Sequence, residues 1–167
     1  MDITISVASI EQKPILRNML ELYIYDFSEF AGFDLNEFGV FGYRYLDHYW
    51  TESHRFPFLF RVEGKLAGFA LVSQVQGQTE FSEFFVMRKY RRQGVGAAAA
   101  HDLFARFPGP WQVTQLQSNH GAQWFWRSVI GRASNGDFRE RIDAERGKVI
   151  QEFSIGDSFL KAIAGRR

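Results

Sequence analysis

The stretch from Thr79 to Ala100 constrains the fold more than any other part of this 167-residue chain. Residues 79–86 alternate in polarity and are rich in aromatic side chains, as in a strand of a buried sheet. A basic turn follows, and Gly94 and Gly96 then come where a helix should begin, just before a run of four alanines. The stretch therefore predicts a strand, a turn and a helix, with the glycines at the helix N-terminus.

This glycine-rich corner has the properties of an anion-binding site. Glycine leaves the backbone open to close approach, and the first N–H groups of a helix have no acceptor within the helix. The open amides belong to Gln93, Gly94, Val95, Gly96 and Ala97, and the nearby cations are Arg88, Lys89, Arg91 and Arg92. Together these groups favour a ligand that carries several phosphates. The alternative is a plain turn whose arginines form a solvated surface.

The pattern Arg91-x-x-Gly94-x-Gly96, after the strand end Phe84-Phe85-Val86, resembles motif A of the GNAT superfamily of acyl-CoA-dependent N-acetyltransferases. The resemblance implies that the loop wraps the pyrophosphate of acetyl-CoA and that the strand end pairs with its pantetheine arm. Asn119-x-x-Ala122-x-x-Phe125 looks like the family's second cofactor-side element, in which the asparagine meets the pantetheine. The cofactor-binding residues implied in this way are Phe85, Val86, Arg91, Arg92, Gln93, Gly94, Val95, Gly96, Ala97 and Asn119.

Hydrophobic patterning extends this resemblance over nearly the whole chain. The expected order is a strand, two helices, three strands, a helix, a strand, a helix and two strands. The strands are expected at residues 3–7, 57–62, 66–75, 79–86, 111–116, 138–144 and 148–155. The helices are expected after the capping box Ser9-x-x-Gln12, at 43–51, after Gly96 and at 119–130. Residues 157–167 are expected to form a short helix or a frayed basic tail. The implied fold is α+β (α/β by some schemes), a mixed, mostly antiparallel central sheet of about seven strands with four helices on its faces. We expect residues 1–167 to form a single domain of this kind.

Two carboxylates on the central strand are candidate general bases. An alkyl ammonium titrates near pH 10.4, so an amine that attacks a thioester must first lose a proton. Glu80 is the first choice, because by the resemblance it falls where some GNAT members carry a glutamate base. Glu83 is the alternative, and their odd separation places the two on opposite faces of the strand. For either, an ion pair with a neighbouring arginine is the competing structural interpretation. The resemblance also assigns the backbone N–H near Val86 to the developing oxyanion.

The N-terminal part of the chain is acidic, which suggests a cationic acceptor. Residues 1–52 hold nine acidic side chains against three basic ones, whereas the remainder holds ten against seventeen. Complementary charge steers encounter, so the acidic part is expected to face an amine. By the resemblance, the candidates to line the acceptor opening are Tyr23, Asp26 and Glu29, followed by Asp34, Glu37 and Tyr43. The competing interpretation is that these carboxylates only solvate helix surfaces.

The sequence departs from the family at one catalytic position. Many members use a tyrosine on the helix after the fifth strand to protonate the leaving thiolate, and here that position is Trp126. An indole N–H can donate a hydrogen bond but is not a proton-transfer acid. Ser128, a tyrosine from the first helices or water is left to supply the proton. Otherwise Trp124, Phe125 and Trp126 are interpreted as core and cofactor-wall packing.

Composition excludes several other classes of protein. The chain has no cysteine, which excludes disulfides, thiolate metal sites and a cysteinyl acyl intermediate. Its four histidines are scattered without metal-ligand spacing, so no metal is expected. The N-terminal segment lacks a signal-peptide pattern and no run reaches the length of a membrane span, which predicts a cytoplasmic protein that does not bind membranes.

The sequence allows two alternatives to an acetyltransferase. One is a CoA-binding or regulatory module that has lost turnover, which the Trp126 departure would suit. The other is nucleic-acid binding through Arg88–Arg92, but one short basic cluster in a chain of net charge +1 is a poor phosphate track. The expected partner is therefore a small-molecule or peptide amine and not a nucleic acid, and self-association into a homodimer is left open.

Overall fold

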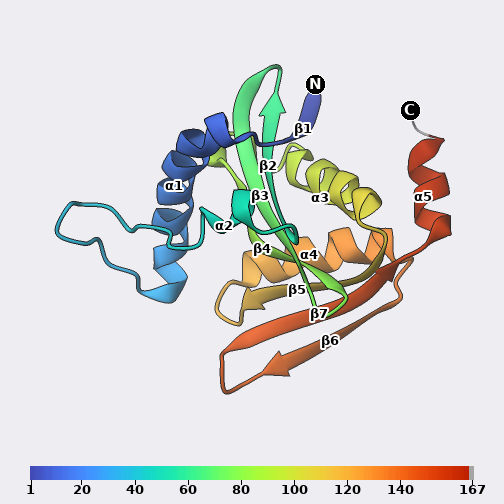
Figure 1. Ribbon diagram of the computed structural model, residues 1–167. Coiled ribbons are helices and arrows are strands. Elements are labelled where there is room, and N and C mark those ends of the chain that lie inside the picture. Colours follow the sequence, from blue (N-terminus) through green and yellow to red (C-terminus); the bar gives the residue numbers. More distant parts are fainter. Residues whose placement is uncertain (166–167) are drawn as a thin grey trace. The chain divides into compact units, whose positions relative to one another are not determined.

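The computed structural model describes residues 1–165 and contains seven strands and five α-helices within that range (Figure 1). The N-terminal elements are β1 (Ile3–Val7), the 3-10 turn η1 (Ile10–Gln12), α1 (Lys13–Ala31), α2 (His48–Thr51), β2 (Arg55–Val62) and β3 (Lys65–Val75). The remaining elements are β4 (Gln78–Val86), η2 (Arg88–Tyr90), α3 (Val95–Arg106), β5 (Gly109–Leu116), α4 (His120–Ala133), β6 (Phe138–Asp143), β7 (Lys148–Ile155) and α5 (Asp157–Ala164).

The strands form a mixed, mostly antiparallel sheet, as expected. Its hydrogen-bonded order is β1-β2-β3-β4-β5-β7-β6. The β1/β2, β2/β3, β5/β7 and β6/β7 pairs are antiparallel, whereas β4 and β5 pair in parallel at Thr79 with Trp111 and at Glu80 with Gln112. The β2–β3 hairpin turns over Glu63 and Gly64, which both have positive φ. A two-residue turn of this kind matches the twist of the flanking strands.

The chain divides into two compact units, which are described separately. The first comprises residues 1–73 and 82–93, and the second comprises residues 74–81 and everything described from Gly94 onward. The boundary falls within β4, so this strand contributes its N-terminal half to the second unit and its C-terminal half to the first.

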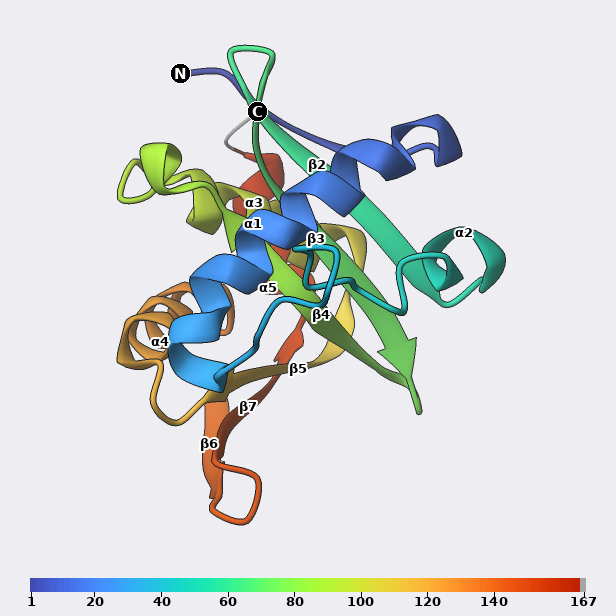
Figure 2. The ribbon, with the colours of Figure 1, turned by 90° about the vertical axis from the view of Figure 1, so that its left-hand side faces the viewer.

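The first unit is built by α1 packing on the strands. The Gln12 side chain accepts a hydrogen bond from the Ser9 N–H at 3.1 Å, so the expected capping box starts the helical segment. α1 buries one apolar face in a cluster with residues of β2, β3 and β4, and Figure 2 shows the helix crossing these strands. Gly68 is required for close strand packing, because a Cβ there would meet the Phe85 carbonyl oxygen at 2.2 Å.

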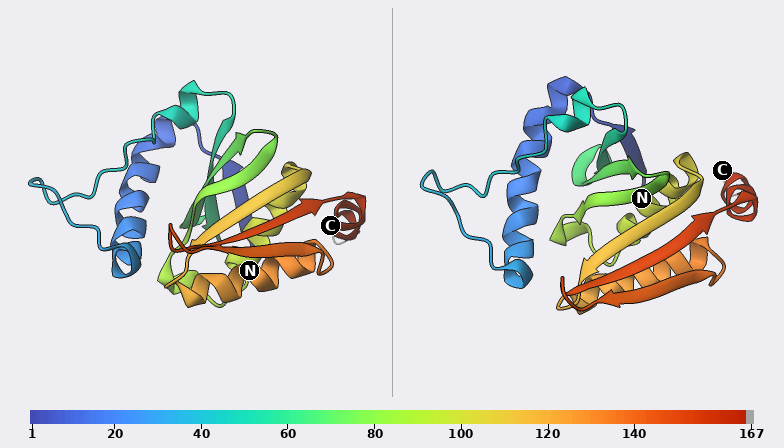
Figure 3. Two further views of the ribbon diagram at one scale, coloured as in Figure 1. Left: turned by 90° about the horizontal axis from the view of Figure 1, so that it is seen from below. Right: turned by 60° about the horizontal axis from the view of Figure 1, so that its bottom comes forward.

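The second unit has an aromatic core. Phe104 of α3 packs against Trp111 of β5 and Phe153 of β7, with ring centroids 4.9 and 5.1 Å apart. These contacts are edge-to-face, a favoured geometry for aromatic rings. α4 lies along β5 and β7, as Figure 3 shows, and buries its apolar side there.

Some expected elements differ from the observed ones. The second helix was expected over residues 43–51, but only His48–Thr51 is α-helical, because the chain forms turns from Arg44 to Asp47. The C-terminal segment forms the helix α5, one of the two alternatives expected for it, and this adds a fifth α-helix to the four expected on the sheet. Residues 166 and 167 of that segment lie outside the described range. Within residues 1–165, no helix is both long and apolar enough to cross a membrane.

Candidate active site

A cavity in the first unit brings together one carboxylate and a set of aromatic rings. Its volume is about 390 Å³. It lies among the C-terminal half of α1, the loop between α1 and α2, and β4. The lining residues are Tyr23, Ile24, Phe27, Phe33, Asp34, Phe41, Gly42, Tyr43, Arg44, Tyr45 and Glu83. Concave sites with apolar walls and a few convergent polar groups are typical of small-molecule binding.

Helix α1 supplies one wall through residues one turn apart. Tyr23 and Phe27 are four residues apart, so they share a helix face, and their rings stack with centroids 5.6 Å apart. The Tyr23 ring also meets Phe69 and Phe85 edge-on, each at 5.9 Å. These contacts fix the Tyr23 ring and leave its hydroxyl to face Glu83.

The opposite wall is the loop between α1 and α2, which a single side chain fastens to the helix. The Glu21 carboxylate accepts hydrogen bonds from the backbone N–H groups of Phe41 at 2.7 Å and Gly42 at 2.9 Å. Farther along the loop, the Asn36 side chain accepts from the N–H groups of Phe38 and Val40. These hydrogen bonds support the backbone of the loop, which is neither helix nor strand. Sequence analysis missed Glu21, because its partners lie 20 and 21 residues away.

Glu83 lies in the cavity wall with tyrosines on either side. Burial raises the pKa of its carboxyl group, and the nearby hydroxyl groups of Tyr23 and Tyr43 only partly oppose this shift. Burial beside Glu83 also raises the pKa of both tyrosines, so both stay protonated at neutral pH and able to donate. The buried Tyr49 hydroxyl lies near Ser82 and Arg55 without forming a well-aligned hydrogen bond. A carboxyl group with a raised pKa in a cavity is a typical candidate for proton transfer.

Glu80, the other candidate base, lies in a different setting. It pairs in register with Gln112 of β5, in the second unit, and it is not among the residues that line the cavity. The odd separation along β4 places it on the opposite face from Glu83. Within the first unit, the structure thus brings Glu83 together with Tyr23, Asp34 and Tyr43, which were expected around an acceptor.

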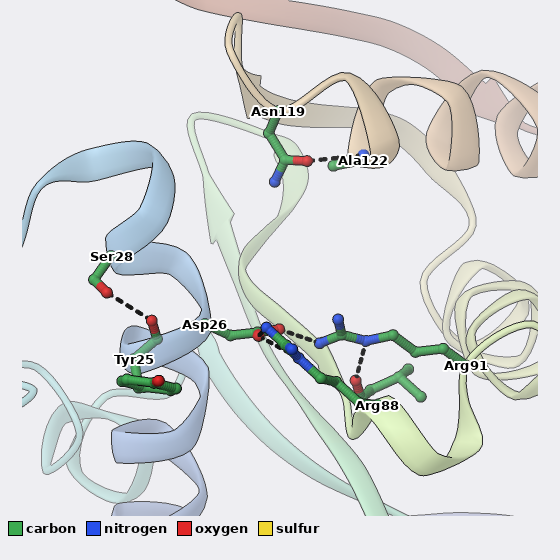
Figure 4. Close-up of polar contacts among 8 residues, drawn as sticks. Tyr25, Asp26, Ser28, Arg88, Arg91, Asn119 and Ala122 are labelled. Carbon is green, nitrogen blue, oxygen red and sulfur yellow. Dashed lines mark hydrogen bonds and ion pairs between the residues drawn. The ribbon is translucent and has the colours of Figure 1, made fainter.

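The basic turn after β4 is tied to α1. The Arg91 Nε–H donates to the Val86 carbonyl oxygen at 2.8 Å, and its guanidinium also pairs with Asp26 (Figure 4). Arg88 donates to the same carboxylate through its Nε at 2.8 Å. Partial burial raises the pKa of Asp26, but the hydrogen bonds from Arg91 and Arg88 outweigh it, and the net pKa is lowered. Asp26 is therefore ionised at neutral pH and forms ion pairs with both arginines of the turn.

The backbone after this turn starts a helix whose first amides have no acceptor within it. Arg92 and Gly94 have φ values of 60° and 83°, in the left-handed region, and α3 begins at Val95. The Ala98 N–H donates to the Gly94 carbonyl oxygen at 2.9 Å, so the amides of Val95, Gly96 and Ala97 precede the first intrahelical bond. The Gln93 side chain folds back and donates to the Lys89 carbonyl oxygen at 2.7 Å. The glycine and the helix start lie where the sequence predicted them, and anion binding at these amides stays a prediction.

A family model for the Acetyltransferase (GNAT) family matches residues 18–131 of the chain. The chain belongs to the GNAT acetyltransferase family. This match covers the cavity, both glutamates, the glycine-rich turn and Asn119. A comparison with curated protein sequences found no significant match.

Solved structures share the fold at low sequence identity. An acetyltransferase from Thermus thermophilus superposes with a TM-score of 0.70 at 14% identity, covering 93% of this chain and 98% of that one. PaiA N-acetyltransferase from Thermoplasma acidophilum, in complex with coenzyme A, gives 0.64 at 13% identity over 92% and 99%. The ribosomal-protein-S18-alanine N-acetyltransferase from Escherichia coli gives 0.61 at 16% identity over 93% and 95%. At these identities the comparison shows a GNAT fold.

The residues expected to bind the acceptor in this GNAT chain separate into two groups. Tyr23 lines the cavity, whereas Asp26 is occupied by the two arginines and Glu29 is exposed outside the cavity lining. Of the further candidates, Asp34 and Tyr43 line the cavity and Glu37 does not.

The residues expected to bind the cofactor also have defined local roles. The Phe85 side chain is buried beneath the Arg91 guanidinium, which lies 5.7 Å from the ring centroid. The Asn119 side-chain oxygen caps α4 by accepting from the Ala122 N–H at 3.0 Å (Figure 4). This capping role uses the amide oxygen and leaves the amide nitrogen as the group for any other partner.

The tryptophans of α4 correct one expectation. Trp126 is 5% exposed and stacks on Phe81 with ring centroids 5.1 Å apart, so it is a core residue as expected. Trp124 is 75% exposed, which contradicts its expected role in packing. Residues two apart on a helix point in different directions, so burial of one tryptophan turns the other outward.

Proposed function

We propose that the protein is an N-acetyltransferase that moves an acetyl group from acetyl-CoA directly to a primary amine. The observation that carries this proposal is the placement of Glu83, a carboxyl group with a raised pKa, in an aromatic cavity of a GNAT chain. That setting suits a group that accepts a proton near neutral pH. Two GNAT-fold neighbours have been solved in complex with coenzyme A or acetyl-CoA, which supports acetyl-CoA as the acyl donor.

In the proposed reaction, Glu83 takes a proton from the bound ammonium, and the free amine attacks the thioester carbonyl. The new C–N bond forms as the C–S bond breaks, with no acyl group on the enzyme. The nitrogen loses its second proton to water, and the departing CoA thiolate gains a proton from water, because the raised pKa values of Tyr23 and Tyr43 make both hydroxyl groups poor acids. A thiol titrates near pH 8.5, so the thiolate is a tolerable leaving group. Trp126 is buried in the core and does not serve as this acid.

We propose that the CoA diphosphate binds the amides of Val95, Gly96 and Ala97. These groups lie at the start of α3 and have no intrahelical acceptor, which supports an anion at this position. Arg92 sits at the preceding left-handed position, while Arg91 holds the strand end through Val86. The roles of Val86 as oxyanion donor and of Asn119 as pantetheine contact stay predictions.

The order of preference between the two glutamates is reversed in this proposal. Sequence reasoning placed Glu80 first, whereas Glu83 lies in the cavity wall, where the hydroxyl groups of Tyr23 and Tyr43 influence its pKa. We therefore assign the general base to Glu83. The cytoplasmic location, the single-domain organisation and any dimerisation stay predictions from the sequence.

The test is amine-dependent release of free thiol from acetyl-CoA, with mass spectrometry of the amine. Thiol release together with an amine that gains one acetyl group is the expected result. Hydrolysis of acetyl-CoA without an acetylated amine would overturn the transferase proposal.

A CoA-binding module without turnover is the second candidate. The buried Trp126, in place of a tyrosine acid, is the observation that favours it. CoA binding by calorimetry, with no thiol release on any amine, would support this candidate instead.

A further inference from the structure

The cavity offers the acceptor a surface that is mostly aromatic. Six of the eleven lining residues are phenylalanine or tyrosine, from α1 and from the following loop. Two of them remain open to solvent, with Phe33 51% and Tyr45 56% exposed. Exposed rings at the edge of a cavity provide apolar area that a ligand can cover.

The charges of the cavity suit one positive group. The lining residues include two carboxylates, Glu83 and Asp34, and one cation, Arg44. Their sum is a single negative charge when Glu83 is ionised. A ligand with several ammonium groups would therefore bring charges that these walls do not balance, and leaving charges unpaired on binding is costly. The tyrosine rings add a favourable surface for one ammonium through cation–π attraction.

The aromatic wall is held in place before any ligand binds. Glu21 fixes the loop at Phe41 and Gly42, and Asn36 closes the turn that follows Phe33. Ring contacts join Phe27 to Tyr23 and to Phe33, with the second pair 6.1 Å apart. Binding to a wall ordered in advance loses less conformational entropy.

We propose that the acceptor is a primary monoamine with an aromatic or otherwise apolar body. Its amino group lies at Glu83, and its carbon skeleton covers Phe27, Phe33 and Tyr45. This inference rests on the proposed function and narrows the acceptor to a substrate class. Polyamines, aminoglycosides and charged peptides fall outside this class.

The test compares acceptors with wild-type protein and saturating acetyl-CoA. The panel contains phenethylamine, methylamine, spermidine, lysine and kanamycin. The proposal expects phenethylamine to have the highest kcat/KM, at least about tenfold above methylamine, since the ring buries apolar area that the methyl group lacks. Fastest acetylation of spermidine, lysine or kanamycin would overturn the inference while leaving the transferase proposal intact.

A matched pair of loop variants tests the wall itself. Phe33→Ala removes a cavity ring, whereas Phe38→Ala removes a ring that is 79% exposed and does not line the cavity. Both rings are exposed, so neither change should disturb folding. Phe33→Ala is expected to lower kcat/KM for phenethylamine about tenfold, whereas Phe38→Ala is expected to leave it unchanged. Equal effects of the two variants would contradict the proposed binding mode.

Binding measured without turnover separates failure of this inference from failure of the proposed function. Phenethylamine is titrated calorimetrically into wild-type protein and Phe33→Ala, each saturated with CoA. Binding that weakens about tenfold in Phe33→Ala supports the site even if no thiol is ever released. No measurable binding to the wild type overturns the inference.

Discussion

Two carboxylates of the first unit, Glu83 and Asp26, are driven in opposite directions by their surroundings. Burial raises the pKa of Glu83, whose neighbours are tyrosines that carry no charge at neutral pH. Burial also raises the pKa of Asp26, but two arginines reverse the shift and hold it below its ordinary value. The same type of group is thus prepared for proton transfer in one place and for a permanent ion pair in the other.

The difference shows why acidity in the sequence does not by itself indicate an acceptor site. Asp26 lies three residues after Tyr23 on α1, yet its charge is used within the protein by Arg88 and Arg91. Glu83 has no arginine or lysine among the groups that shift its pKa. The partners of a carboxylate, and not its position in an acidic segment, decide its role.

The largest expected effect comes from removing the proton acceptor. Glu83→Gln keeps the shape of the side chain and is expected to lower kcat about 100-fold or more, the usual contribution of a general base. The matched control is Glu80→Gln on the same strand, which should keep kcat within a few-fold of the wild type. Thiol release at saturating substrates measures both. A large loss of kcat in Glu80→Gln, with Glu83→Gln still active, would instead assign the general base to Glu80.

Misfolding does not explain the loss expected for Glu83→Gln. The folded pKa of Glu83 is raised above 4.5, so its contribution to stability is present below that pH and is lost as pH rises through the folded value. At pH 8 the glutamine variant should therefore have a melting temperature no lower than that of the wild type. A clear drop would show that Glu83 supports the fold instead.

A smaller effect is expected from the tyrosines beside Glu83. The Tyr23 hydroxyl lowers the pKa of Glu83, so Tyr23→Phe should raise that pKa further. The acid limb of the kcat/KM profile then moves to higher pH, with a loss of several-fold on the acid side and little change at high pH. Tyr25→Phe is the control, because Tyr25 is exposed on α1 and does not line the cavity. An acid limb that stays at the same pH would show that Tyr23 does not influence the titrating group.

The smallest effect is expected from breaking the ion pairs of Asp26 with Arg88 and Arg91. Asp26→Asn should lower the free energy of unfolding at pH 7 by about 1 kcal/mol or less, because pairs with exposed arginines contribute little. The folded pKa of Asp26 is lowered, so this deficit is present above about pH 3.8 and disappears as pH falls through the folded value. Urea unfolding at several pH values measures it, with Glu29→Gln as the control on the same helix. If the free energy of unfolding of Asp26→Asn is still below that of the wild type at pH 2, the variant has lost packing or hydrogen bonding and not the charge of Asp26.

Local patterns predicted most of the elements. The last strand was expected at 148–155 and is observed there, because its alternation is flanked by the Arg146-Gly147 turn. The first strand and the hairpin around Gly64 were predicted for the same reason. These features depend on residues that are near in sequence, so sequence periodicity is sufficient to find them.

The site needed contacts that no local pattern contains. Glu80 and Glu83 could be assigned to opposite faces of β4, but the cavity face is decided by where α1 packs. The α1–α2 loop is joined to α1 by Glu21, whose partner Phe41 lies 20 residues away in the sequence. The ion pair between Asp26 and Arg91 joins residues that are 65 positions apart in the sequence. Contacts of this range leave no periodic signal in a single sequence.

A crystal structure of the chain with bound CoA tests the central claim most directly. The account predicts diphosphate oxygens within hydrogen-bond distance of the Val95, Gly96 and Ala97 amides at the start of α3. CoA bound away from the start of α3 would contradict it.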